Sequence, residues 1–147
     1  MDKICSGFGN RNIFVDITKC LNEAICYAIE EGCIVFYTGA MGEFDKLFSS
    51  AVREAKRKNP NIKLICVKPY MTKEINESLV YKSNLYFDDL IVPEELAGIH
   101  YKAAIGKRNE WMIDHSNIVL VYTIRNYGGA NTAKKYALKN GKFIIEL

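Results

Sequence analysis

Short apolar segments alternate with segments of helical period along the whole chain, and this alternation constrains the fold more than any other feature. Cys33–Tyr37 is an unbroken apolar run (C-I-V-F-Y), which is typical of a strand covered on both faces. Strands that alternate with helices predict a parallel sheet joined by right-handed crossovers. We therefore expect an α/β fold, a Rossmann-like three-layer sandwich with a mostly parallel sheet of about six strands.

The predicted elements follow from apolar periodicity and from turn residues. The strands are Lys3–Cys5, Cys33–Tyr37, Lys63–Val67, Asp89–Val92, Asn117–Tyr122 and Phe143–Leu147. The helices cover Ile17–Glu31, Glu43–Lys58, Thr72–Tyr81, Lys102–His115 and Asn131–Lys139. We expect Asp16 to cap the first helix and Gly32 to end it. The segment Leu79–Gly106 gives no clear functional pattern and could form part of a lid or a dimer contact.

Composition narrows the functional classes. The chain has 147 residues, 49% hydrophobic and 25% charged, with a net charge of +3, so we expect one folded domain over residues 1–147. It has neither an apolar run long enough to span a membrane nor a signal-peptide pattern, which predicts a cytoplasmic protein without a membrane partner. The mild charge does not by itself predict nucleic-acid binding. The five cysteines and two histidines show no metal-ligand spacing, so we expect free core thiols, no metal and no cofactor.

In parallel sheets of this kind ligands bind beyond the carboxyl ends of the strands, so the residues after each strand are the candidates for function. Ser6–Arg11 (S-G-F-G-N-R) follows the first strand. Its two glycines, Gly7 and Gly9, would let the backbone turn tightly and approach a ligand, and Arg11 could bind an anion. An ordinary tight turn explains the glycines equally well.

A second glycine-bearing loop, Thr38–Asp45 (T-G-A-M-G-E-F-D), follows the second strand and opens a helix. Thr38, Gly39 and Gly42 would present free N–H groups at the positive end of the helix dipole, which suits a phosphate. Glu43 and Asp45 partly oppose an anion there, and they could instead cap the helix or bind ribose hydroxyls.

The helix at Lys102–His115 carries Arg108, Trp111, Met112 and His115 on one face. Its N-terminal half should lie at the ligand edge, so Arg108, with its neighbour Asn109, is the candidate for the site. We expect Trp111 and Met112 to pack in the core and His115 to cap the helix C-terminus.

A Gly-Gly pair follows the fifth strand, in Tyr127–Thr132 (Y-G-G-A-N-T). Gly128, Gly129 and Ala130 allow close approach of a phosphate, and Thr132 could add a hydroxyl donor. Two glycine loops on neighbouring strands should face one crevice, and their convergence predicts a phosphate-bearing ligand, most simply a nucleotide.

Three of these four segments carry a resemblance to a known family: T-G-A-M-G-E-F-D, R-N-E-W-M-I-D-H-S-N and G-G-A-N-T. In this order and spacing they resemble the SLOG superfamily, which includes the Lonely Guy phosphoribohydrolases and the DNA-processing protein DprA. The similarity is greatest to the YpsA-like branch, whose opening T-G-H-R is matched only loosely by Gly9-Asn10-Arg11. The resemblance covers essentially the whole chain. It implies a Rossmann-like fold and a pocket for a nucleotide or a nucleotide derivative.

The Lonely Guy enzymes carry R-K-x-x-M followed by P-G-G-x-G-T-x-x-E, in which the arginine and the glutamate serve N-glycosidic cleavage. Arg108 and Met112 match the first segment, and Gly128, Gly129 and Thr132 match the second. Tyr127 stands at the proline position, Asn131 at a glycine and Lys135 at the glutamate. Because a lysine cannot stabilise the cationic sugar of an oxocarbenium-like transition state, the resemblance does not carry that activity to this chain.

Three functions remain open. The first is a sensing or regulatory module that binds an adenine nucleotide or an ADP-ribose-like ligand. The second is an N-glycoside hydrolase of nucleoside monophosphates, with Asp45 or Glu43 as the carboxylate and Arg108 on the phosphate. The third is a DprA-like module for single-stranded DNA or protein, to which the basic stretches Arg53–Lys58 and Lys134-Lys135 lend slight support, although solvated helix faces are the simpler explanation for them. Related families form dimers, so we expect a homodimer or a higher homo-oligomer.

Overall fold

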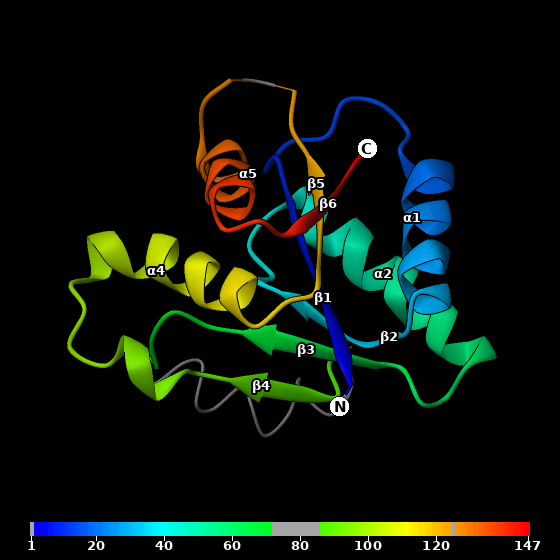
Figure 1. Cartoon of the computed structure of the whole chain (residues 1–147), viewed down its shortest axis with the longest axis horizontal. Coiled ribbons are helices and arrows are strands. Elements are labelled where there is room, and N and C mark those ends of the chain that lie inside the picture. The colour runs from blue at the N-terminus through cyan, green and yellow to red at the C-terminus, as the bar shows by residue number, and fades with distance from the viewer. Residues whose placement is uncertain (1, 72–85, 125) are drawn as a thin grey trace.

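The computed structural model describes residues 2–71, 86–124 and 126–147 (Figure 1). Their strands are β1 (Lys3–Gly9), β2 (Cys33–Thr38), β3 (Lys63–Val67), β4 (Asp89–Ile91), β5 (Ile118–Tyr122) and β6 (Phe143–Glu146). Their helices are α1 (Thr18–Glu30), α2 (Glu43–Lys58), α4 (Tyr101–Asp114) and α5 (Gly129–Lys139), with a short 3₁₀ helix at Glu94–Leu96. In these ranges no helix is long and apolar enough to cross a bilayer.

The strands of the described residues form one all-parallel sheet of six strands in the order β4-β3-β2-β1-β5-β6. The chain builds outward from β1 to β4 and then returns to add β5 on the other side of β1, so β1 lies where the direction of winding reverses. Cys5 pairs with Phe36 of β2 and with Ile118 of β5. In open parallel sheets a crevice forms at such a reversal, beyond the carboxyl ends of the strands.

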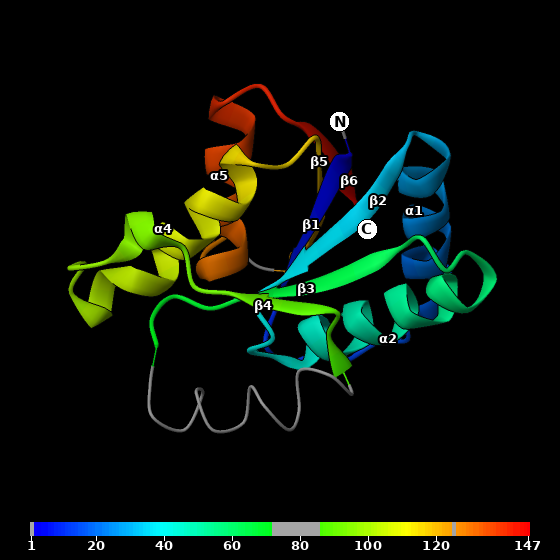
Figure 2. The ribbon, with the colours of Figure 1, turned by 90° about the horizontal axis from the view of Figure 1, so that it is seen from below.

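Helices cover both faces of the sheet, which gives three layers (Figure 2). One face packs against α1 and α2 through a cluster that includes Leu21, Phe44 and Phe48. The other packs against α4 and α5 through a cluster that includes Met112 and Ala137. The predicted α/β three-layer fold with a parallel sheet is thereby confirmed.

The first strand is longer than predicted, and the expected tight turn at Ser6–Arg11 is wrong. β1 continues through Gly9, so Gly7 and Gly9 are strand residues. They are glycines because aromatic rings of α2 lie against them: a Cβ on Gly7 would fall 2.6 Å from the Phe48 ring, and one on Gly9 would overlap Phe44. The two glycines let α2 approach the sheet closely.

The other boundaries differ from the predictions by one or two residues, apart from α2 and β3, which begin and end as predicted. α1 begins at Thr18, and its N-cap is Ile17, not Asp16 as predicted; the Asp16 carboxylate, just before the helix, instead accepts a hydrogen bond from the Thr18 N–H. Gly32 ends α1 with a φ of +105°, as predicted. α5 begins at Gly129, two residues before the predicted start. The predicted helix at Thr72–Tyr81 lies outside the described residues.

The cysteines are all free, but not all lie in the core as predicted. Cys5, Cys33 and Cys66 are buried, and burial raises the pKa of each thiol. Cys20 and Cys26 are exposed because they lie on the outer face of α1.

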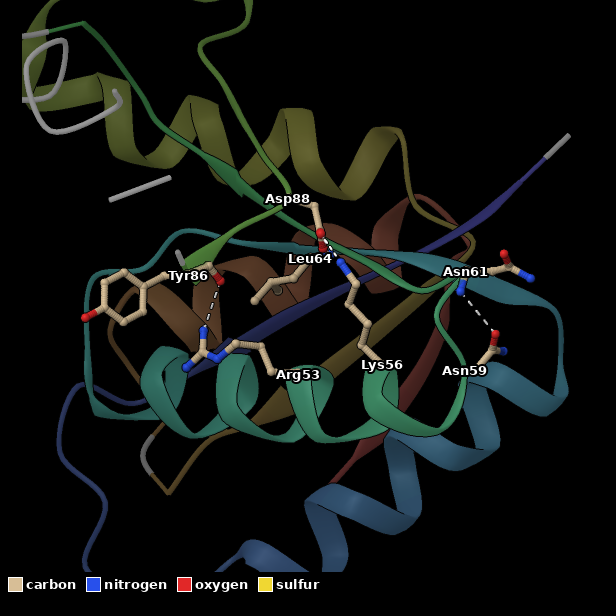
Figure 3. A network of polar contacts seen from close by, with 7 residues as sticks. All are labelled: Arg53, Lys56, Asn59, Asn61, Leu64, Tyr86 and Asp88. Atoms are coloured by element: carbon tan, nitrogen blue, oxygen red, sulfur yellow. Dashed lines mark hydrogen bonds and ion pairs between the residues drawn. The ribbon is translucent and has the colours of Figure 1, made fainter. Parts of the chain in front are cut away.

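Polar contacts hold the segment before β4 against α2 and β3 (Figure 3). Arg53 donates a hydrogen bond to the Tyr86 carbonyl at 3.1 Å, and Lys56 forms an ion pair with Asp88. Asp88 also accepts the Leu64 N–H at 2.8 Å. These contacts fix the chain at the edge of the sheet, where β4 pairs with β3.

Candidate functional site

A cavity of about 440 Å³ lies at the carboxyl edge of the sheet, where the loops after β1, β2 and β5 meet α4. Such a volume falls within the range of small-molecule sites. It is lined by Gly7, Phe8, Gly9, Asn10, Arg11, Asn12, Phe14, Gly39, Met41, Gly42, Asp45, Ile105, Arg108, Asn109, Ile124, Tyr127, Gly128, Gly129 and Ala130. The two predicted glycine loops therefore face one cavity. The predicted residues Thr38, Glu43 and Thr132 do not line it.

Several backbone N–H groups of the loop after β2 donate hydrogen bonds to acceptors within the protein. Asp45 accepts the Met41 N–H at 2.9 Å, and the Thr38 hydroxyl accepts the Ala40 N–H at 3.2 Å. The Glu43 N–H donates to the Arg11 carbonyl at 2.9 Å. Three amides of this loop, those of Ala40, Met41 and Glu43, therefore have protein acceptors, and two carboxylates lie in the first turn of α2. This end of the cavity is poorly suited to an anion.

The start of α5 is different, because its backbone is open to the cavity. Its first turn has no acidic residue, and no side chain caps it. Across the described ranges, no hydrogen bond involves the N–H groups of Gly129 or Ala130. A Cβ on Gly128 or Gly129 would meet nothing within 4 Å. Free amides at the positive end of a helix dipole are well placed for an anion.

Thr132 takes no part in this opening, since its hydroxyl donates to the Gly128 carbonyl at 3.0 Å. Gly128 has a φ of +102° and a ψ of 174°, a conformation that essentially only glycine adopts. This conformation turns the chain from β5 into α5.

Arg108 forms the buried wall of the cavity. Only 3% of the residue is exposed. Nη1 donates to the Val67 carbonyl at 2.8 Å and to the Gly39 carbonyl at 3.5 Å, while Nε donates to Asn109 Oδ1 at 2.8 Å. Gly39 must be glycine because a Cβ there would lie 2.8 Å from the guanidinium. Arg108 thus ties the ends of β2 and β3 to α4.

Among the charged groups around Arg108, the Asp45 carboxylate has the strongest electrostatic effect on its pKa. Burial raises the pKa of Asp45, while amide hydrogen bonds from Met41 and Gly42 and the charge of Arg108 act in the opposite direction. Burial also lowers the pKa of Arg108, against the effect of Asp45. A half-buried carboxyl with a raised pKa on a cavity wall can accept or donate a hydrogen bond to a ligand hydroxyl.

Two further predictions about α4 are confirmed. Met112 is fully buried, and Trp111 stacks against Tyr37 and His115. His115 is the C-cap residue, and its ring nitrogen pairs with the Trp111 carbonyl at 2.8 Å.

Several side chains of the basic stretches are engaged within the protein. Within Arg53–Lys58, Arg53 and Lys56 hold the chain before β4, and Arg57 pairs with Glu54 (Figure 3 shows the first two). Lys134 pairs with Glu146. Nor do the described residues bring together three His, Cys, Asp or Glu side chains in a way that could hold a metal ion.

Sequence reasoning missed the apolar part of the cavity. Phe14, Met41, Ile105 and Ile124 line it, but it did not single them out as site residues. The one available signal was the apolar run Ile13–Val15, which lies between a strand and a helix and fits the period of neither.

No family model matches this sequence, and no curated protein matches it either. Among solved structures it is similar to the molybdenum cofactor binding protein from the phototrophic bacterium Rippkaea orientalis, at 19% identity over 99% of this chain and 76% of that one, with a TM-score of 0.64. DNA processing protein A (DprA) from Streptococcus pneumoniae matches at 15% identity over 99% of this chain, with a TM-score of 0.66. This chain covers only half of that protein.

The molybdenum cofactor carrier protein MCP from Chlamydomonas reinhardtii is a further match, at 16% identity over 99% of this chain and 76% of that one, with a TM-score of 0.56. At these identities the similarity shows a shared fold. The fold is the Rossmann-like type that the SLOG resemblance implied, and it is shared with these two molybdenum cofactor proteins and with DprA.

Proposed function

We propose that this chain binds a phosphate-bearing, nucleotide-derived small molecule in the cavity at the carboxyl edge of the sheet and serves as a sensing or regulatory module. The observation that carries the proposal is the open start of α5, whose Gly129 and Ala130 amides face a cavity of about 440 Å³. Two of the structures that share the fold are those of a molybdenum cofactor binding protein and a molybdenum cofactor carrier protein. The YpsA-like branch stays a prediction from the motifs.

The cavity provides one place for each part of such a ligand. A phosphate would lie at the start of α5, where free amides and the helix dipole favour it. Arg11 has an exposed side chain on the cavity wall, and the described part of the chain gives it no ion pair, so it would add the neutralising charge. Asp45 would accept a ribose hydroxyl. Arg108 would act mainly by fixing the wall, since its guanidinium is already bound to backbone carbonyls.

The test pairs one change inside the cavity with the same kind of change outside it. Gly129→Asp places a carboxylate in the first turn of α5, where the added Cβ meets nothing. Thr18→Asp does the same at the first residue of α1, which also lacks acidic residues in its first turn. Both changes suit a helix N-terminus, so both variants should fold.

Binding is measured as the shift in melting temperature of each variant. The ligands tested are inorganic pyrophosphate, ribose 5-phosphate, AMP, ADP and ADP-ribose. A ligand at 100 times its Kd should stabilise the wild type by about 2.7 kcal/mol. Gly129→Asp should weaken binding at least about tenfold by charge repulsion, while Thr18→Asp should bind as the wild type does. The proposal fails if no member of the panel shifts the wild-type melting temperature.

One observation favours an N-glycoside hydrolase as a second candidate: the raised pKa of Asp45 on the cavity wall, as a general acid requires. Glu43, the other predicted carboxylate, is held outside the cavity by the Ile13 N–H at 3.0 Å. Chromatography for free base from AMP decides the matter. Wild-type release that is lost in Asp45→Asn would establish the hydrolase, and the absence of release would exclude it for that substrate.

A further inference from the structure

Large, mostly apolar side chains that are partly or largely exposed line the cavity. Phe14 is 73% exposed, Tyr127 67%, Ile124 47% and Met41 40%. Single exposed apolar residues are ordinary, whereas several around one concave site mark a surface that a partner or ligand covers. These four come from the loops after β1, β2 and β5, which meet only at this edge of the sheet.

The loop that carries Phe14 is fixed on both sides of it. Asn10 Oδ1 accepts the Ile124 N–H at 2.9 Å, and the Arg11 carbonyl accepts the Glu43 N–H at 2.9 Å. The Ile13 N–H donates to the Glu43 carboxylate at 3.0 Å, and Ile17 is only 4% exposed. The backbone around Phe14 is thus held to β5 and α2, while the residue itself is exposed and lines the cavity.

The cavity lining therefore combines two kinds of group. The polar ones include the α5 amides and Arg11, and the apolar ones include Phe14, Ile124 and Met41. A phosphate alone would use only the polar groups. A ligand that covers both has an anionic group joined to a flat apolar group, and an aromatic ring binds such a group by stacking on its face.

We propose that Phe14 is the stacking surface for a planar heterocycle and that it makes the site select heterocycle-bearing phosphates over simple sugar phosphates. This inference rests on the proposed function, because it assigns the second half of the same ligand. Phe14 is a specificity-determining residue here, while the α5 amides bind the group that all phosphate ligands share.

The experiment compares Phe14→Ala with Val15→Ala. Val15 is the next residue, 60% exposed, and it does not line the cavity, so its truncation is the matched control. The probes are AMP and ADP-ribose, which carry a heterocycle, and ribose 5-phosphate and inorganic pyrophosphate, which do not. Affinities are measured by calorimetry. Because both side chains are exposed, both variants should unfold at the wild-type temperature.

Loss of a stacked base weakens binding by about 5-fold to about 150-fold. We expect a loss in this range for the two heterocycle-bearing probes in Phe14→Ala, with no change for the other two probes, and no change for any probe in Val15→Ala. Phe14→Tyr should restore binding, whereas Phe14→Leu, apolar but without a ring, should not.

The outcomes separate the two proposals. Wild-type binding of AMP that Phe14→Ala leaves intact, or that Phe14→Leu supports fully, overturns the stacking role and keeps the proposed function. An equal loss for pyrophosphate also overturns it, because Phe14 would then shape the whole site. No binding of any probe by the wild type overturns both.

Discussion

Replacing Arg108 by methionine tests whether this residue is first a structural clamp of the cavity wall. Its guanidinium donates to the carbonyls of Val67 and Gly39, both of which are buried residues. Leaving a buried acceptor without a donor costs about 1–3 kcal/mol, and the 2.8 Å bond to Val67 contributes more than the 3.5 Å bond to Gly39. Because methionine removes the desolvation cost of a buried cation, part of that loss is recovered. We expect Arg108→Met to lower the free energy of unfolding by about 2–3 kcal/mol.

The assay is urea unfolding followed by circular dichroism, with the melting temperature as a second measure. For a chain of this length the loss corresponds to a melting temperature lower by about 5–10 °C. The matched control is Arg57→Met, since the Arg57 side chain is 79% exposed and pairs with Glu54 one helical turn away. Exposed pairs of this kind contribute about 0.3–0.5 kcal/mol, so the control should be nearly neutral.

An Arg108→Met variant as stable as Arg57→Met would refute the clamp. The two carbonyls would then find water or other donors without Arg108, and its burial would have no structural consequence. Arg108→Lys gives a graded check: lysine keeps the charge but not the planar set of donors, so its stability should lie between those of the wild type and Arg108→Met.

Three further predictions concern single positions. Gly128→Ala should lower the free energy of unfolding by about 1–3 kcal/mol, because a φ of +102° strains any residue with a side chain, whereas Gly129→Ala should be neutral. An added Cβ meets nothing within 4 Å at either position. Equal stabilities of the two variants in urea unfolding would therefore contradict an origin in the backbone. Gly7→Ala should cost about 1–3 kcal/mol through overpacking, since the Cβ would lie 2.6 Å from the Phe48 ring, and wild-type stability would show that α2 can move away. Burial raises the pKa of Asp45 above the ordinary carboxyl value of about 3.9, so Asp45 holds its proton more tightly in the folded state than in the unfolded chain. The free energy of unfolding should therefore fall as the pH rises from about 3.9 through the pKa of Asp45 in the folded state. Asp45→Asn should remove this fall from a pH series of unfolding curves, and an unchanged series would assign it to other groups.

The architecture could be predicted because each strand carries its own signal. An unbroken run such as Cys33–Tyr37 is compatible only with burial on both faces, and the helix Glu43–Lys58 has an apolar stripe that fixes which side meets the sheet. The end of β1 could not be predicted in this way. Gly7 and Gly9 disfavour a strand by local propensity, and the reason for them is a pair of rings more than thirty residues away. Long-range packing decided that boundary against the local signal.

The site shows the same division. That the loops at Gly39 and Gly128 face one cavity followed from topology, because carboxyl ends of neighbouring parallel strands share an edge. What each loop does with its amides depends on side chains that fold back on it, as Asp45 does on Met41. The sequence offered capping and ribose binding as alternatives for that carboxylate and could not choose between them. Phe14 was missed because an apolar residue in a loop carries no periodic signal.

The starts of α2 and α5 differ in charge, and this difference makes the two sides of the cavity unequal for a ligand. At α2 the loop amides of Met41 and Glu43 have acceptors within the protein, and two carboxylates, Glu43 and Asp45, occupy the first turn. At α5 the amides are open and no carboxylate lies nearby in the sequence, so the local potential is positive. A ligand with a single anionic end therefore has one favourable orientation, with its phosphate at Gly129 and its neutral donors toward Asp45. A ligand anionic at both ends would meet Asp45 with the wrong sign. Two glycine loops that look equivalent in the sequence thus differ in charge, because only the helix that begins at Glu43 carries carboxylates in its first turn.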